Sequence, residues 1–569
     1  MIDEETSHPS KDVVSRRRFM QVATSATVGS ALLAACGGNP TSTTPLKAAP
    51  TTGTLPQSQI DATVTASVGK TYFPAELHIP AAYTAPPPLY QTVKYVPGTG
   101  KRVQAFEVYF ATPSVPKAQN KFWQELDRRL NVDWEVIQVI SDDYSTKSAL
   151  QLSSNKPADF ILMLNNGDTG AVIDPVFTQA MAQGAFNDLT SFLSGNALKE
   201  FPNLSLIAPS VWQNSSYQGK IYGVPRSRTE LPTVLMYHQE WADKLGLAMP
   251  QNPDEFYKWM VTMTNSKITG KKVYGFGGRA FFGMNGYIRS IYGVPNNWRV
   301  ESDGSFTNAI ETDEFKQALD LERRLWAAGT YHPDSPIANN KQSKTGFEAG
   351  NYASYLDGPG AMTAEQTRAT AINPNAMIHI MVPMNNQGKV LRYRDVGYLG
   401  MTGIPTNATG DSDRIKELLR VLDWLSAPVF SIEQQFLAYG IDGWDSTLNK
   451  NHLRQTTTRG MNEIGELTAV TSSPQVYFYP ANPQYSVYLQ QMTRQMMDQA
   501  IPDPSWGLSS PTQDKLNFAL TKQLTSDFQR IVTGKDPMST LPDVIKRWLD
   551  QGGTKIKQEL ADSYRKVHG

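Results

Sequence analysis

The chain has 569 residues, and its 53 Lys and Arg residues balance 53 Asp and Glu residues, so the formal net charge is zero. That balance gives no support to a nucleic acid partner or an acidic polymer as substrate, and it favours a neutral ligand. The single cysteine excludes an internal disulfide, a thiolate-held iron–sulfur cluster and a Cys-based zinc site, while the length predicts more than one domain or lobe.

Two delivery signals occupy the first 36 residues. Three arginines, Arg16 to Arg18, precede a short apolar run that ends in small residues and Cys36, which is the order of a signal peptide. "SRRRFM" resembles the twin-arginine export motif with Arg16 and Arg17 as its pair, and "LAAC" resembles a bacterial lipobox. The resemblance implies a signal peptide over 1–35 and an acylated Cys36 that anchors the protein to a membrane outside the cytoplasm.

A linker is predicted next, over residues 36–102. This stretch is rich in Pro, Thr, Ser, Ala and Gly and has little helical or strand periodicity. Aromatic residues between Tyr72 and Tyr95 predict that this part lies against the folded body. Beyond residues 19–35, no apolar run approaches the roughly 20 residues that a membrane-spanning helix needs.

Strands and helices alternate from Val103 onward. The pattern predicts a strand over 103–110, a helix containing Trp123, a strand over 132–140, a helix over 144–154 and a buried strand over 160–164. Right-handed crossovers would make these strands parallel. A later helix is expected to start at Thr312, an N-cap residue, and to stop at Gly329, and another to end before Pro428. No repeat of fixed period is present.

Catalytic signatures are missing from the sequence. The H-E-x-x-H, G-x-S-x-G and G-x-x-x-x-G-K-[ST] motifs do not occur, and the seven histidines include no i,i+4 pair. The carboxylates Asp442 and Asp445 have the chemistry for glycoside hydrolysis, but solvated surface is the favoured interpretation of such a pair. We therefore predict no catalytic residues, no metal and no cofactor.

Several segments, in order and spacing, carry a resemblance to a known family. They include "GAFNDLTSFL" (184–193), "GKIYGVPRSR" (219–228), "EWADKLGLAMPQNPDEFYKWM" (240–260) and "IVTGKDPMSTLPDVIKRWLDQGG" (531–553). From Val103 to the C-terminus the chain resembles the extracellular solute-binding proteins, family 1, of bacterial ATP-binding-cassette (ABC) importers, in the lipoprotein branch that feeds oligosaccharide importers. One departure is "TNSKITGKKVYGF", where lysines stand in place of an Asp-rich calcium-type loop.

The resemblance implies an α/β fold in the form of a two-lobed, periplasmic-binding-protein-like clamp. Each lobe would be a mostly parallel sheet flanked by helices, and a hinge would join the two discontinuous lobes. Lobe 1 is expected to comprise residues 103–230 and 397–450, and lobe 2 residues 231–396 and 451–569.

The expected ligand site lies beyond the carboxyl ends of the strands. Loop positions and polar or flat side chains suited to sugars nominate a set of candidates: Thr112, Asn165, Asp168, Trp212, Arg226, Arg228, Phe281, Asn285, Trp298, Asp357 and Trp444. Each aromatic residue has core packing as its alternative role. Arg226 and Arg228 have a structural ion pair at the hinge as theirs.

These features together predict a non-enzymatic, lipid-anchored monomer. It would capture a carbohydrate, preferably a neutral oligosaccharide, and deliver it to a membrane-embedded ABC permease. The same fold binding a sugar acid, polyol or peptide is the alternative. A secreted enzyme is a third hypothesis, because twin-arginine export often serves proteins that fold around a cofactor in the cytoplasm.

Overall fold

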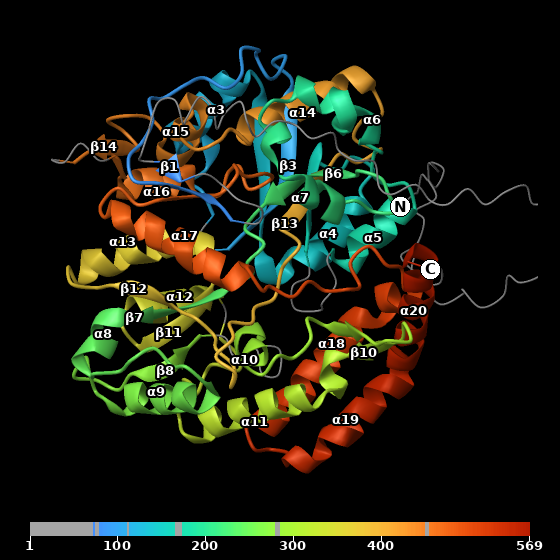
Figure 1. Cartoon of the computed structure of the whole chain (residues 1–569). Coiled ribbons are helices and arrows are strands. Elements are labelled where there is room, and N and C mark those ends of the chain that lie inside the picture. Colours follow the sequence, from blue (N-terminus) through green and yellow to red (C-terminus); the bar gives the residue numbers. More distant parts are fainter. Residues whose placement is uncertain are drawn as a thin grey trace, which may run out of the picture. The chain divides into compact units, whose positions relative to one another are not determined.

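The computed structural model describes residues 72–73, 79–110, 113–165, 173–278, 285–338, 340–449 and 454–568. Six of the residues singled out from the sequence lie outside these ranges: Arg16, Arg17, Cys36, Thr112, Asp168 and Phe281. Within the described part of the chain, two larger sheets organise the core (Figure 1).

The first sheet has five strands in the order β4-β3-β5-β13-β6. Their bounds are β3 (Arg102–Tyr109), β4 (Asp133–Ile140), β5 (Phe160–Leu164), β6 (Gly223–Ser227) and β13 (Tyr398–Gly403). The first three strands along the chain pair in parallel, as the sequence predicts. Strand β13 runs antiparallel to both of its neighbours.

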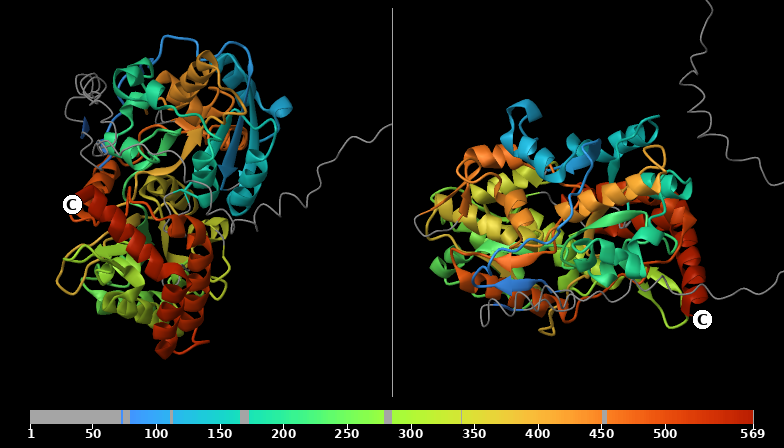
Figure 2. Two further views of the ribbon diagram at one scale, coloured as in Figure 1. Left: turned by 90° about the vertical axis from the view of Figure 1, so that its right-hand side faces the viewer. Right: turned by 90° about the horizontal axis from the view of Figure 1, so that it is seen from above.

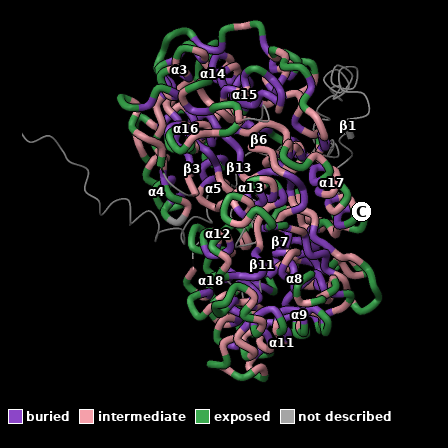
Figure 3. Tube along the Cα trace, turned by 90° about the vertical axis from the view of Figure 1, so that its left-hand side faces the viewer, coloured by how far each residue is buried: buried purple, intermediate pink, exposed green. Residues whose placement is uncertain are grey.

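Helices cover both faces of this sheet. Val103 and Ala105 of β3 face one core cluster, while Phe106 and Val108 face another. Helices on the first face are α3 (Lys121–Leu130), α6 (Thr190–Leu193), α7 (Pro209–Asn214), α14 (Ser412–Leu425) and α15 (Ile432–Tyr439), and those on the second are α4 (Tyr144–Leu152) and α5 (Pro175–Ala182). Burial on both faces explains the nearly continuous apolar run of β5. Figure 3 shows the neighbouring strands β3 and β13 as mostly buried.

The second sheet has the order β12-β7-β11-β8. Its strands are β7 (Val234–His238), β8 (Tyr274–Gly277), β11 (Tyr352–Asp357) and β12 (Ile378–Met381). Only the β8–β11 pair is parallel, so this sheet is mixed like the first. In β7, Leu235 and Tyr237 face one core cluster while Val234 and Met236 face the other.

Helices flank the second sheet. One core cluster draws on α8 (Gln239–Lys244), α9 (Pro253–Asn265), α10 (Gly286–Ile291), α11 (Asp313–Ala327), α18 (Pro511–Val532), α19 (Leu541–Trp548) and α20 (Thr554–His568), and the other on α12 (Asn340–Glu348), α13 (Met362–Ile372) and α17 (Pro483–Met497). Thr312 caps α11 as predicted, since its hydroxyl accepts a hydrogen bond from Phe315 N at 3.2 Å. Figure 2 shows the C-terminal helices, in red, beside the green and yellow helices of this cluster.

The prediction of an α/β protein with helix-flanked sheets is confirmed, but the expected mostly parallel pairing is replaced by mixed sheets. The reason lies in the path of the chain. The chain leaves β6 at Ser227 and forms the second sheet. It then re-enters the first sheet at Tyr398, which pairs with Ser227 at the end of β6. A strand that begins where its neighbour ends must run antiparallel to it.

Two stretches also pack differently from the expected division into linker and lobes. In the expected linker, Ile79 and Ala82 join the core beside the second sheet, and Val93 joins the core of the first. Strand β2 (Ala81–Tyr83) pairs with β16 (Val476–Phe478). Helix α16 (Thr458–Ile464) contacts α3, so residues 458–470 pack with the first sheet rather than the second.

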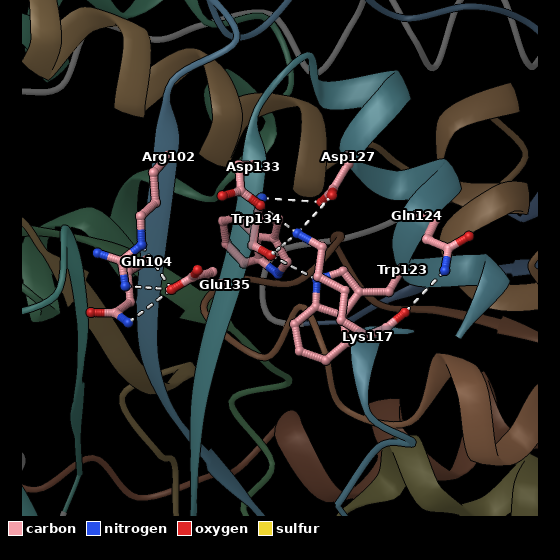
Figure 4. A network of polar contacts seen from close by, with 9 residues as sticks. All are labelled: Arg102, Gln104, Lys117, Trp123, Gln124, Asp127, Asp133, Trp134 and Glu135. Carbon is pink, nitrogen blue, oxygen red and sulfur yellow. Dashed lines mark hydrogen bonds and ion pairs between the residues drawn. The ribbon is translucent and has the colours of Figure 1, made fainter. Parts of the chain in front are cut away.

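A polar network holds the amino-terminal edge of the first sheet (Figure 4). Lys117 Nζ lies 2.7 Å from Asp127 and 2.6 Å from Asp133, and Trp123 Nε1 donates to the carbonyl oxygen of Trp134 at 2.8 Å. Arg102 and Glu135 pair across the starts of β3 and β4. Because these groups satisfy one another at the amino edge, the carboxyl edge is the part of the sheet left to consider for ligand binding.

Candidate ligand-binding site

The carboxyl ends of β3, β5 and β6 meet at one edge of the first sheet, together with the start of β13. Asn165 follows β5 directly and ties it to β13, because its Nδ2 donates to Tyr398 O at 2.7 Å and its backbone N to Leu399 O at 2.9 Å. Among the described residues, the Asn165 Oδ1 atom is buried and has no hydrogen-bond partner. An acceptor is therefore held in place at this edge.

Arg226 lies near the end of β6 at the same edge. Its side chain is half-buried, and its Nη1 atom is buried without a hydrogen-bond partner in the part of the chain that the structure describes. Burial lowers the pKa of Arg226, while the negative charges of Glu466 and Glu107 oppose that shift. The guanidinium thus stays charged and keeps one donor available.

The negative charges of Glu107 and Glu466 act on Arg226, and neither residue was a candidate from the sequence. Glu107 of β3 is 0% exposed and accepts a hydrogen bond from Val470 N at 3.1 Å. Burial raises the pKa of Glu107 to about 8 although Arg226 opposes the shift. Burial also raises the pKa of Glu466, whose carboxylate accepts from Phe110 N at 3.0 Å. The only sequence signal for Glu107 was one acidic residue inside the mostly apolar strand "VQAFEVYF".

Arg228 lies in the segment that joins the two sheets, where it forms an ion pair with Asp395. A reciprocal pair joins Arg394 to Glu230 at 3.3 Å. The backbones of the two segments are also bonded, Arg228 N to Gly397 O at 2.9 Å and Asp395 N to Glu230 O at 2.7 Å. The structural alternative for Arg228, an ion pair at the hinge segments, matches this placement.

Asp357 is the candidate from the second sheet that lies next to the segment joining the two sheets. It ends β11 opposite Val234, the first residue of β7, and accepts hydrogen bonds from Gly358 N at 2.7 Å and the Tyr355 hydroxyl at 3.2 Å. Burial raises the pKa of Asp357. Three residues later, a Cβ on Gly360 would lie 2.9 Å from Gln475 Nε2. Gln475 Oε1 in turn accepts from Thr229 N at 3.2 Å, close to the end of β6.

Three other candidates have surroundings of their own. Trp212 is 1% exposed in the core of the first sheet, and Trp298 is 5% exposed beside Trp548 in the core of the second. Asn285 caps α10 by accepting from Tyr287 N at 3.0 Å. Packing accounts for Trp298 and capping for Asn285, whereas Trp212 Nε1 is buried without a hydrogen-bond partner among the described residues.

Trp444 lies against α3 and α16 rather than at the sheet edge. The Lys121 ammonium is 3.6 Å and the Arg459 guanidinium 3.9 Å from the centre of its ring. Its Nε1 donates to Glu463 at 3.0 Å. Cation–π contacts and this hydrogen bond give Trp444 a role in joining helices.

The described residues hold no cluster of three or more His, Cys, Asp or Glu side chains with the geometry for a metal ion. No helix in the described ranges is both long and apolar enough to cross a bilayer.

Comparison with known proteins assigns the chain to a family. The model for bacterial extracellular solute-binding proteins matches residues 112–428, more than half of the chain. The chain belongs to this family. It is therefore a solute-binding component of ABC transport and not an enzyme.

Individual relatives are distant. The polygalacturonan/rhamnogalacturonan-binding protein YtcQ of Bacillus subtilis (strain 168) is 22% identical over 384 residues, which are 66% of this chain and 76% of YtcQ. Lipoprotein LipO of the same organism is 20% identical over 473 residues, 80% of this chain and 90% of LipO. The crystal structure of the alginate-binding protein AlgQ2 without calcium ion aligns with a TM-score of 0.60 at 15% identity, covering 82% of this chain and 99% of AlgQ2. At such identity this last match shows the fold.

Proposed function

We propose that this solute-binding protein captures an oligosaccharide between its two sheets and delivers it to the permease of an ABC importer. The proposal is supported by the positions of three residues: Asn165 and Arg226 stand at the carboxyl ends of β5 and β6, and Asp357 ends β11 opposite Val234, where the segment that joins the sheets enters β7. A planar amide, a guanidinium and a carboxylate can each form hydrogen bonds to two neighbouring hydroxyls of a sugar. The names of YtcQ and AlgQ2 as polysaccharide-binding proteins support this ligand class.

Closure of the two sheets on the ligand would be the signal to the permease. The segments around 228–233 and 382–397 connect the sheets, and a few residues in such segments can absorb a hinge motion. A ligand that contacts both sheets would bind the closed arrangement more tightly than the open one, and its binding would therefore shift the protein toward the closed arrangement.

A thermal-shift experiment tests the ligand class. Purified protein lacking residues 1–35 is heated with a panel of oligosaccharides built from glucose, mannose, galactose, fructose, xylose or uronic acids. A ligand at 100 times its Kd should add about 2.7 kcal/mol to the free energy of unfolding and raise Tm visibly. Polyols and short peptides serve as the alternative ligands. No shift with any saccharide, or a shift with peptides alone, would refute the proposal.

A second candidate ligand is a sugar acid, because Arg226 places a positive charge at the junction. Binding of matched neutral and uronic oligosaccharides, with and without Arg226→Ala, separates the two classes. An acidic ligand should lose far more affinity than a neutral one when the guanidinium is removed.

Membrane attachment through Cys36 is part of the same proposal, and the lipoprotein name of LipO supports it. We expect Cys36→Ala to move the protein from the membrane fraction to the medium or periplasm, since two or more acyl chains are what make such anchoring stable. Ligand affinity should not change. Cell fractionation with immunoblotting measures the location of the protein, and calorimetry measures its ligand affinity. The double variant Arg16→Lys, Arg17→Lys tests export through the twin-arginine route. Persistent membrane attachment of Cys36→Ala would show that Cys36 is not the anchor.

A further inference from the structure

Residues 79–99, here called the strap, connect the two sheets before the chain enters the first of them. Ile79 and Ala82 are buried in the core beside the second sheet, whereas Val93 is buried in the core of the first. The chain therefore passes from one sheet to the other once before it reaches β3 (blue in Figure 2). Ligand capture at the strand ends does not account for this additional crossing.

Three carboxylates of α14 and α15 fasten the strap to the first sheet. Each accepts a hydrogen bond from the strap: Glu433 from Thr92 N at 2.9 Å and Val93 N at 3.3 Å, Glu417 from Thr99 N at 2.8 Å, and Asp423 from the Tyr95 hydroxyl. None of the three acidic residues is more than 4% exposed. Because leaving a buried acceptor unpaired costs free energy, this part of the strap is held to the first sheet.

Strand pairing fastens the other end of the strap to elements beside the second sheet. Strand β2 pairs in parallel with β16, and Gln490 of α17 donates a hydrogen bond to Pro80 O at 2.9 Å. Both β16 and α17 belong to the core beside the second sheet, through Tyr477 and Leu489. The strap is therefore bound at both of its ends.

An aromatic contact joins the strap to both sides at once. The Phe430 ring lies edge-on to Tyr83 of β2 and to Phe478 of β16, with ring centroids 4.7 and 5.0 Å away. Phe430 stands between α14 and α15 and has φ +73°, a conformation that is strained for a bulky residue. Such strain persists only where surrounding contacts impose it. The contact thus holds a loop of the first sheet against the β2–β16 pair.

The part of the strap between its two attachments is stiff. It has the sequence "TAPPPL" (84–89), with prolines at positions 86, 87 and 88. Each proline fixes its own φ at about −65° and restricts the residue before it to extended conformations. A proline-rich segment therefore behaves as a semi-rigid spacer. A spacer of this kind, bound at both ends, resists changes in the relative position of the two sheets.

We propose that the strap stiffens the hinge and confines the ligand-free protein to a narrow range of arrangements of the two sheets. The segments 228–233 and 382–397 would still bend, but within the limits that the strap sets. A confined hinge loses less conformational entropy when a ligand closes it, so the strap also strengthens ligand binding. The effect on the ligand-free protein is independent of the ligand, whereas the effect on binding rests on the proposed function.

The distance between two spin labels, one beside each sheet, tests the stiffness of the hinge. The labels are attached to Leu150→Cys on α4 and Lys316→Cys on α11, both at exposed positions. A Cys36→Ala background removes the native cysteine, so that only these two positions are labelled. Double electron–electron resonance then gives the distribution of distances without ligand.

Two changes loosen the strap, and each has a matched control. Pro86→Gly with Pro88→Gly removes two exposed prolines from the spacer, and Pro374→Gly with Pro537→Gly makes the same change at exposed prolines in other loops. Glu433→Ala removes the acceptor of two N–H groups of the strap, whereas Glu433→Gln keeps an acceptor oxygen. Far-UV circular dichroism and Tm check that each variant is folded.

We expect one narrow distribution of distances in the wild-type protein and in both controls. The Pro86→Gly, Pro88→Gly variant and Glu433→Ala should each broaden it by at least about 1.5-fold, because a flexible or detached spacer no longer confines the hinge. Affinity for the saccharide that binds most tightly in the panel, measured by calorimetry, should fall by at least about 3-fold in the same two variants.

The outcomes separate this inference from the proposed function. A distribution of unchanged width in the folded Pro86→Gly, Pro88→Gly variant overturns the role of the strap, whatever the ligand does. A broader distribution with unchanged or higher affinity overturns its contribution to binding. If no saccharide binds, the proposed function fails, while the distances in the ligand-free protein still decide whether the strap stiffens the hinge.

Discussion

Replacing Glu107 with Gln should stabilise the protein at pH 8 and remove much of the pH dependence of its stability. The folded-state pKa of Glu107 is raised from 4.5 to about 8 by burial, so the folded state binds a proton that the unfolded state has released. Stability contributed by this proton is fully present below about pH 4.5 and is lost as the pH rises toward about 8. The slope approaches about 1.4 kcal/mol per pH unit in that window.

The groups that face Glu107 come from several elements. Val470 N donates a hydrogen bond to its carboxylate at 3.1 Å. Arg226 of β6 and Gln138 of β4 lower the pKa of Glu107, whereas the negative charge of Glu466 raises it. Urea unfolding of wild type and Glu107→Gln at half-unit steps from pH 5 to 9 measures the difference, with Glu200→Gln as the exposed control. Parallel curves for the wild type and Glu107→Gln would mean that Glu107 titrates normally.

Arg392→Met should lower the free energy of unfolding by about 2–4 kcal/mol. Arg392 is 0% exposed and lies in the segment that returns from the second sheet to the first. Its Nη1 donates to Gly286 O at 2.9 Å, and its Nη2 donates to both the carbonyl and the hydroxyl oxygen of Thr233, the latter at 2.9 Å. Met fills similar space but leaves these partly buried acceptors without their donor.

Chemical unfolding at pH 7 gives the magnitude for Arg392→Met. Arg392→Lys should lose less, since an ammonium can keep one of the bonds but cannot span both Gly286 and Thr233 as the guanidinium fork does. Arg299→Met, at a half-exposed arginine paired with Glu301 at 2.9 Å, should cost less than about 1 kcal/mol. Equal losses for Arg392→Met and Arg299→Met would show that the free-energy cost of burying the Arg392 guanidinium cancels the stabilisation from its hydrogen bonds.

Local features of the fold followed from the sequence because their causes are local. The strand, helix and strand over 102–140 and the cap of α11 at Thr312 depend on residues within a few positions of one another. The same holds for Asn165 and Arg226, which stand at the ends of strands that the apolar pattern already marks. The family resemblance, spread over ordered short segments, predicted the α/β solute-binding fold that the family model confirms.

The direction of β13 and the pairing around Arg226 came only from the tertiary structure. Periodicity shows that a residue is buried but not what it is buried against, so Trp212 and Trp298 were candidates although both pack in cores. Glu107 meets the segment of Glu466 and Val470 across about 360 positions of sequence. Contacts at that separation depend on how sheets stack and where the chain returns. The sequence by itself therefore determined the elements and the family, while the folded chain decided which charges act on Arg226.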